Sequence, residues 1–110
     1  RMDKAAATTL FESLASGHRL DIWRLLIRQG STGLVAGEIA SSLQLPATNL
    51  SFHLKALTQA GLLTVTQEGR YQRYRANLPL MQDLVDYLTA ECCAAQPQDC
   101  GVPDVCKREN

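Results

Sequence analysis

Residues 35–61 have the sequence VAGEIASSLQLPATNLSFHLKALTQAG, and this stretch decides the fold class. Its first part carries an apolar face with helical spacing, formed by Ile39, Ala40 and Leu43. Pro46 keeps the residue before it out of helical backbone, so residues 44–46 are predicted to turn. A second apolar face with i, i+4, i+7 spacing follows, formed by Leu50, Leu54 and Leu57. Gly61 is a natural C-terminal stop for that helix. Two short helices joined by a three-residue turn indicate a helix-turn-helix.

The sequence after this motif, LLTVTQEGRYQRYRA (residues 62–76), has the period of two that is typical of β-strands. Leu63 and Val65 alternate with threonines, and Glu68 with Gly69 predicts a hairpin turn. The return strand is basic, and its two tyrosines, Tyr71 and Tyr74, are expected to anchor the hairpin. A helix-turn-helix followed by a basic hairpin is typical of a winged helix.

Helices are predicted on both flanks of the winged helix-turn-helix. One covers residues 3–15, and Ser16 can cap a second helix that runs to about Gln29. Pro79 suits the first turn of a last helix. Its apolar stripe is Met81, Leu84, Val85, Leu88 and then Cys92. The predicted fold is therefore mainly α with a small β-hairpin, in the order α-α-α-α-β-β-α. Residues 1–95 form the domain, and residues 96–110 an irregular, cysteine-containing tail.

Composition agrees with one small globular domain of 110 residues. The sequence has no apolar run long enough to span a membrane, and its start lacks the apolar core of a signal peptide, so a cytoplasmic protein without a membrane partner is expected. The formal net charge is zero, but its distribution is uneven. Residues 47–75 carry four basic side chains and one acid, a balance of +3, whereas residues 79–104 carry five acids and no base. Since attraction to phosphate depends on the local field, residues 47–75 suit a nucleic-acid partner.

The predicted second helix of the motif presents a polar surface opposite its leucines. We call this surface the reading face; it consists of Thr48, Asn49, Ser51, Phe52 and Lys55. Hydroxyl and amide groups can contact bases or phosphates, and Phe52 can contact a thymine methyl group in double-stranded DNA. An ordinary solvated helix face is the alternative, but such a face seldom carries an outward Phe or precedes a hairpin with three arginines. Those arginines, expected to contact phosphates or the minor groove, are Arg70, Arg73 and Arg75. His53, near the inward edge, is expected to pack or cap rather than bind a ligand.

Three segments, ASGHRLDIWRLL, SFHLKALTQAGLL and EGRYQRYR, resemble the ArsR/SmtB family of metal-responsive bacterial repressors. The resemblance covers roughly residues 8–93. It implies a homodimer built on the first and last helices, and an operator near a set of resistance genes. It also implies release of the operator when a ligand binds.

The family's best-known ligand sites are not retained. Its arsenic sensors carry a Cys-x-Cys pair before the second helix of the motif, where this chain has Val35 and Gly37. Its zinc sensors use His and carboxylates on the last helix, where this chain has Asp83 and Asp86 but no His after position 53. The adjacent cysteines near the end of the last helix, with another downstream, instead resemble a branch with a C-terminal arsenic site.

All four cysteines lie in the last nineteen residues, and three of them fall within ECCAAQPQDC, residues 91–100. Trivalent arsenic and antimony are soft ions that favour three thiolates, and Cys92, Cys93 and Cys100 are the predicted ligands. Pro97 favours a bend that returns Cys100 to the pair, and Cys106 is expected to be dispensable. The spacing lacks the C-x2-C knuckle that is usual for zinc. Two alternatives remain. Cys92 can simply be a small apolar residue, or Cys92 and Cys93 can act as a redox sensor.

The sequence therefore predicts a DNA-binding repressor that releases double-stranded operator DNA when arsenite or antimony binds. A redox-sensing or a zinc- or cadmium-responsive repressor of the same fold remains open. A thiol oxidoreductase is disfavoured, because it would need a C-x-x-C pair at a helix start. A constitutive architectural DNA binder would leave the cysteines unexplained. The preference among arsenite, antimonite and methylated arsenicals is also open.

Overall fold

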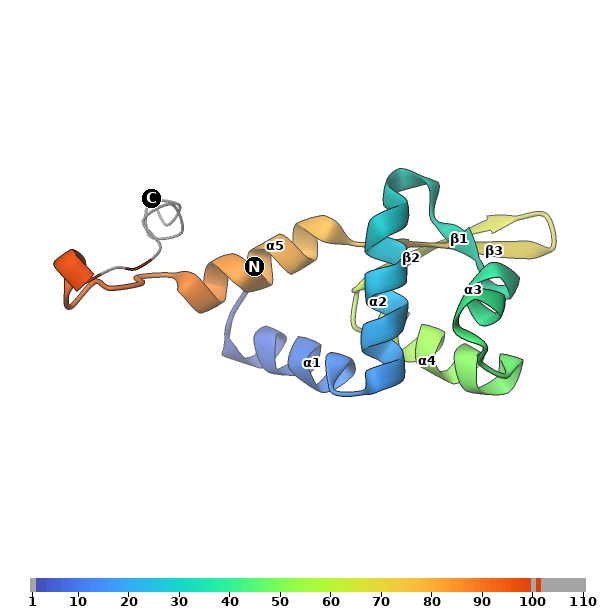
Figure 1. Cartoon of the computed structure of the whole chain (residues 1–110), viewed down its shortest axis with the longest axis horizontal. Helices are drawn as coiled ribbons and strands as arrows, with labels where there is room; N and C mark the ends of the chain where they lie inside the picture. Colours follow the sequence, from blue (N-terminus) through green and yellow to red (C-terminus); the bar gives the residue numbers. More distant parts are fainter. Residues whose placement is uncertain (1, 100, 102–110) are drawn as a thin grey trace.

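The computed structural model describes residues 2–99 and 101, so Cys100 and Cys106 lie outside the described part. The described residues form five α-helices and a three-stranded sheet, shown in Figure 1. The elements are α1 (Lys4–Leu14), α2 (Gly17–Gln29), β1 (Leu34–Val35), α3 (Ala36–Leu43), α4 (Ala47–Gln59), β2 (Leu63–Glu68), β3 (Tyr71–Ala76) and α5 (Leu78–Thr89). Short 3-10 turns span Gly30–Thr32 and Pro97–Asp99. The predicted winged helix-turn-helix is confirmed, with residues 44–46 as the turn between α3 and α4.

Helix boundaries follow from caps that the sequence provides. The Ser16 hydroxyl accepts a hydrogen bond from the Arg19 backbone N–H at 3.4 Å and so starts α2. The Asn77 side chain accepts from the Leu80 N–H at 3.2 Å and starts α5, with Pro79 in the first turn as predicted. Gly30, with φ of 59°, ends α2 in a conformation that other residues adopt at a cost.

The core lies where α2 crosses the other helices and the sheet. The predicted leucines of α4 are buried, and the fully enclosed side chains of the core are Ile22, Leu26, Ile39, Leu57, Leu62 and Leu63. Each such side chain contributes about 1.5–3 kcal/mol when it leaves water. This core fixes α4 against α2 and α3, and therefore fixes which face of α4 points outward.

The sheet has one strand more than the sequence predicted. β1 pairs antiparallel with β3, so the strand order is β1-β3-β2 and the hairpin is tied to the segment before α3. Gly33 makes this possible, because a Cβ there would collide with the Tyr74 carbonyl and lie 2.8 Å from Arg75 Cγ, and its φ is +61°. The hairpin turn is also shifted by one residue: its two loop positions are Gly69 and Arg70. Gly69 has φ of +63°, as the first loop position of a type II′ turn requires.

The molecule is elongated, with principal extents of 54 × 24 × 24 Å, and α5 projects from the winged domain (Figure 1). Leu84 is the buried residue of α5, whereas Leu78, Tyr87 and Leu88 are exposed. Phe11 on α1 is exposed as well. Among the described residues, none of the helices combines the length and the apolar character that a membrane span needs.

Candidate nucleic-acid interface and cysteine pair

The reading face lies on the solvent side of α4. Its five predicted residues, Thr48, Asn49, Ser51, Phe52 and Lys55, are all exposed. Phe52 keeps 65% of its surface accessible. The buried leucines on the opposite side set this orientation, as the helical period predicted.

Two side chains of α2 flank the reading face. Arg19 Nε donates a hydrogen bond to His53 Nδ1 at 3.1 Å, and Arg19 Cζ lies 5.5 Å from the centroid of the Phe52 ring. The His18 ring lies 5.5 Å from the His53 ring. Burial, then the charges of Arg19 and His18, lower the pKa of His53, so the imidazole is kept in the neutral form that can accept. His53 packs at the inward edge as expected, but sequence reasoning missed Arg19, its partner 34 positions away.

The three arginines of the wing have different surroundings. Arg73 Nε contacts both carboxylate oxygens of Glu68 at 3.0 Å, and its Nη1 donates to the Thr32 carbonyl at 3.2 Å. Arg75 donates to the Ser31 carbonyl at 2.7 Å and to Thr66 Oγ1 at 3.1 Å. These two guanidinium groups therefore hold the wing to the turn before β1. Arg70 lies exposed in the hairpin turn and, within residues 2–99 and 101, has neither a salt bridge nor a side-chain hydrogen bond.

The two wing tyrosines do not share a role. Tyr74 is 8% exposed, and its hydroxyl donates to Gln72 Oε1 at 3.1 Å. Burial raises the pKa of Tyr74. Tyr71 is 60% exposed, so the prediction that it anchors the wing is wrong. Residues three apart in a strand point to opposite faces, and only Tyr74 faces the core.

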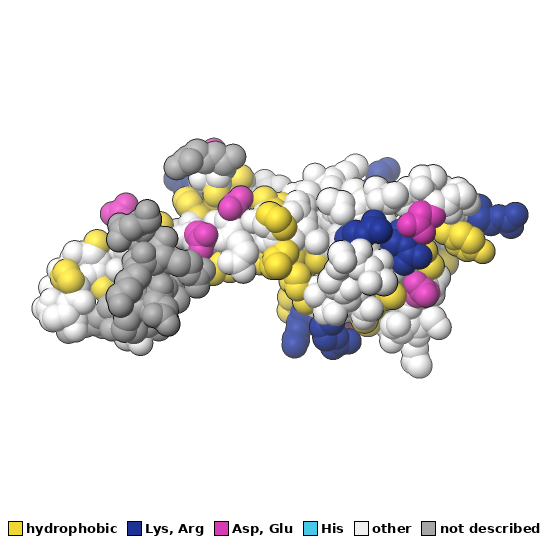
Figure 2. Space-filling model, turned by 90° about the horizontal axis from the view of Figure 1, so that it is seen from above, with side chains coloured by type: hydrophobic (Ala, Val, Ile, Leu, Met, Phe, Trp, Pro, Cys, Tyr) yellow, Lys and Arg dark blue, Asp and Glu magenta, His cyan; other side chains and the backbone are white. Residues whose placement is uncertain are grey.

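A hollow of about 320 Å³ separates α4 from the wing. Ser51 and Lys55 line it from α4, and Val65, Gln72 and Tyr74 line it from the strands. It thus combines a hydroxyl, an ammonium and an amide between the two elements that a winged helix presents to DNA. Figure 2 views the molecule from the side away from α4, and most of the Lys and Arg side chains visible there lie in the half that carries the wing. The polar groups that line the hollow suit a phosphate backbone that passes between α4 and the wing.

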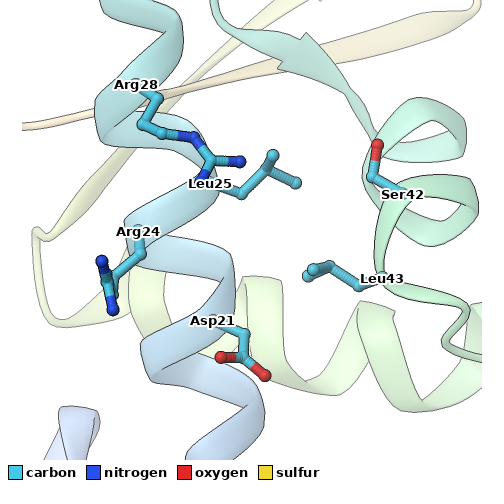
Figure 3. A pocket seen from close by; sticks show the side chains of 6 residues that line it. All are labelled: Asp21, Arg24, Leu25, Arg28, Ser42 and Leu43. Atoms are coloured by element: carbon cyan, nitrogen blue, oxygen red, sulfur yellow. The ribbon is translucent and has the colours of Figure 1, made fainter.

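A second hollow, about 450 Å³, lies between α2 and α3 (Figure 3). Leu25 and Leu43 point into it, whereas Arg24 extends away from α3. Its other lining residues are Asp21, Arg28 and Ser42. This set contains no thiol or imidazole that could act as a nucleophile or a metal ligand.

Cys92 and Cys93 lie beyond the end of α5 rather than on it. The helix ends at Thr89, three residues earlier than the predicted stripe, and a series of tight turns follows. The two Sγ atoms are 3.6 Å apart and both residues are half-buried. In the described part, no group of three or more His, Cys, Asp or Glu side chains could hold a metal ion. The third predicted ligand, Cys100, lies outside the described residues, so its place relative to the pair stays a prediction.

The fold and the reading face together define a winged helix-turn-helix transcriptional regulator. A model of a helix-turn-helix domain matches residues 14–66. Among solved structures, HlyU from Vibrio cholerae is 30% identical, with 79% of this chain and 97% of that one covered and a TM-score of 0.63. An ArsR-like regulator from Rhodococcus is 27% identical over 76% of each chain, with a TM-score of 0.68. A homodimeric winged helix-turn-helix DNA-binding domain from Mycobacterium bovis is 28% identical, with 84% and 90% covered and a TM-score of 0.62.

The chain belongs to the ArsR family of DNA-binding transcriptional regulators. None of the curated proteins compared with it matches its sequence. Because members of the family are transcriptional regulators, the prediction that the chain is not an enzyme is confirmed.

Proposed function

We propose that the chain is a homodimeric, cytoplasmic repressor that releases operator DNA when trivalent arsenic or antimony binds Cys92, Cys93 and Cys100. The observation that carries the proposal is the approach of the first two sulfurs to 3.6 Å at the end of α5. With ion–sulfur bonds of about 2.3 Å, as in zinc thiolates, and a bond angle of roughly 100°, two ligating sulfurs lie about 3.5 Å apart. The pair is thus already spaced as two ligands of one ion would be.

The backbone around the pair supports the proposal. Glu91 and Cys93 have φ of 60° and 61°, a left-handed conformation that non-glycine residues adopt at a cost. Hydrogen bonds from Cys92 N to Thr89 O, from Ala94 N to Glu91 O and from Gln96 N to Cys93 O close successive turns. These turns bring two adjacent side chains to the same side of the chain. Residues in such sparsely populated conformations cluster at functional sites.

The position of the pair gives a route to the DNA. α5 carries exposed Tyr87 and Leu88 next to the pair, and α1 carries exposed Phe11, which together suit a contact with a second copy of the chain. The related domain from Mycobacterium bovis is described as homodimeric. A dimer must place two reading faces about one turn of DNA apart. An ion that rearranges the end of α5 changes that spacing and favours the DNA-free state.

The proposal is tested by titrating the complex of the protein with a duplex selected from a random-sequence library. Arsenite and antimonite are expected to release the duplex at lower concentration than zinc. Cys92→Ser, Cys93→Ser and Cys100→Ser should each bind the duplex but no longer respond to arsenite. Cys106→Ser is the matched control and should respond normally. Normal release from both Cys92→Ser and Cys93→Ser would show that the site is not at this end of the chain.

The same distance between sulfurs favours one alternative, a redox sensor in which the two thiols become oxidised. One of the related structures is described as reduced HlyU. The titration therefore includes a hydroperoxide. Release by the hydroperoxide and not by arsenite would support the redox function instead.

A further inference from the structure

The guanidinium of Arg19 contacts two other helices from the first turn of α2. Its Nη1 donates to the carbonyl of Ser13, near the end of α1, at 3.5 Å. Its Nε donates to His53 Nδ1 on α4 at 3.1 Å, and its Cζ lies 5.5 Å from the centre of the Phe52 ring. One side chain therefore connects α1, α2 and α4 at the edge of the reading face.

We infer that Arg19 is a positioning residue for sequence recognition, which fixes the Phe52 ring and reinforces the orientation that the core gives α4, without itself contacting a base. The inference rests on the reading face entering the DNA groove. It assigns sequence discrimination, rather than general affinity, to a residue that lies outside α4 and the wing.

Phe52 needs such support because its ring is largely exposed. The side chain of a residue with 65% of its surface in water exchanges freely between staggered rotamers unless neighbours restrict it. Here Arg19 lies near the ring at a cation–π distance, and the His53 ring meets it edge-on at 5.6 Å and 63°. The ring is thus ordered before DNA arrives, and an ordered group loses less entropy on binding.

The hydrogen bond from Arg19 to His53 connects α4 to the rest of the domain. A guanidinium is planar and donates in fixed directions, so the Nε bond sets the rotation of α4 more tightly than a lysine ammonium could. The contact with Ser13 extends the connection to α1, which carries the exposed Phe11. A change at that surface can therefore reach α4 through Arg19.

The bond to His53 requires a neutral imidazole. The charged or titratable groups that act on its pKa are Arg19 and His18, both from α2. Glu12 of α1 lines a hollow together with Arg19. Protonation of His53 would replace the acceptor by a second donor beside the guanidinium. Discrimination should therefore weaken in acid, which gives a readout that a purely structural arginine would not change.

The test compares affinities for two duplexes, one selected from a random-sequence library with the wild-type protein and one scrambled with the same composition. Arg19→Gln is expected to lower affinity for the selected duplex about three- to tenfold. It should leave affinity for the scrambled duplex within about twofold, because no phosphate contact is lost. Arg19→Lys should not restore discrimination. Arg24→Gln is the matched control, since it makes the same change on the same helix away from the reading face, and should behave as wild type.

A double-mutant cycle with Phe52→Leu separates positioning from folding. If Arg19 acts through the ring, Arg19→Gln should cost much less affinity in the Phe52→Leu background than in wild type. Additive losses, or equal losses on both duplexes, would overturn the inference.

His53→Gln keeps a neutral hydrogen-bond acceptor beside Arg19, so this variant can test the inference if Arg19→Gln does not fold. Its discrimination should stay constant as pH falls below 6.5, whereas that of wild type should decline. If discrimination changed with pH in the same way in wild type and in His53→Gln, Arg19 would not act through its bond to the neutral His53 imidazole. Unchanged affinities in both Phe52→Leu and Lys55→Ala would instead show that the reading face itself is wrong.

Discussion

Gly33 has a hydrogen atom where other residues have a side chain, and this allows the wing to pair with the segment before α3. At Gly33 the side chain of any other residue would collide with the Tyr74 carbonyl, and φ of +61° would strain the backbone as well. Gly37 on α3 has open space around its Cα and ordinary helical surroundings. Substitution by alanine is therefore expected to change the free energy of unfolding in opposite directions at these two glycines.

Gly33→Ala is expected to lower the free energy of unfolding by about 2 kcal/mol or more, because the β1–β3 pairing must shift to make room. Gly37→Ala should raise it by about 0.5–1 kcal/mol, because alanine favours the helix. Urea unfolding at one fixed protein concentration measures both. Equal effects would mean that β1 does not pack on β3 in solution.

His53 makes stability depend on pH. Its pKa is lowered in the folded chain by burial and then by Arg19 and His18, so the unfolded chain binds the proton more tightly. The stabilisation is fully present above 6.5, the ordinary pKa of histidine, and is lost as pH falls through the lower value of the folded state. The wild-type protein should therefore lose more unfolding free energy than His53→Gln between pH values above and below 6.5. Identical losses would indicate that His53 titrates normally in the folded chain.

Among the structural elements, α4 could be predicted from the sequence, whereas the wing could be predicted only in part. A helical period that places three leucines on one side necessarily places the reading face on the other, and the structure agrees. β1 has only two residues and is defined by partners about forty positions away, so no local pattern could reveal it. The distance between Arg19 and His53 in sequence hides their contact in the same way. Of the predicted thiol site, the approach of two sulfurs is observed, and Cys100 lies outside the described residues.

The reading helix and the wing should both contribute to the salt dependence of DNA binding. Lys55→Ala and Arg70→Ala are each expected to reduce the slope of log affinity against log salt by about 1, because each removes a phosphate contact. Arg73→Ala should give a similar decrease. Its bond to Glu68 is partly exposed, with side-chain accessibilities of 25% and 42%, and such a pair contributes only about 0–1 kcal/mol, so a phosphate can replace it. If Arg73→Ala kept the full slope, that guanidinium would remain on Glu68 in the complex.

At the scale of the whole molecule, the projecting α5 has too little core of its own. Leu84 is buried against the domain, while Leu88 keeps 56% of its surface exposed. The proposed homodimer covers this side of α5. Without a partner, apolar surface next to the cysteine pair would stay in water.

Leu88→Glu is expected to shift the protein toward monomer and to lower operator affinity at least about tenfold, because a charge would be buried in the contact. Gln82→Glu adds the same charge to an exposed position on another side of α5 and should leave the dimer intact. Sedimentation equilibrium gives the oligomeric state, and binding to the selected duplex gives the affinity. A dimeric Leu88→Glu would place the contact elsewhere.

The exposed side of α5 also has a consequence for how the cell maintains the protein. A newly made chain that has not met a second copy displays Leu88 and Phe11, and opened or incompletely covered chains are the ones that proteases remove. Formation of pairs depends on the square of the chain concentration. When synthesis is low, halving the gene dose would therefore reduce the number of surviving pairs by more than half. Because unpaired chains are removed, the amount of active protein would change by a larger factor than the rate of synthesis does.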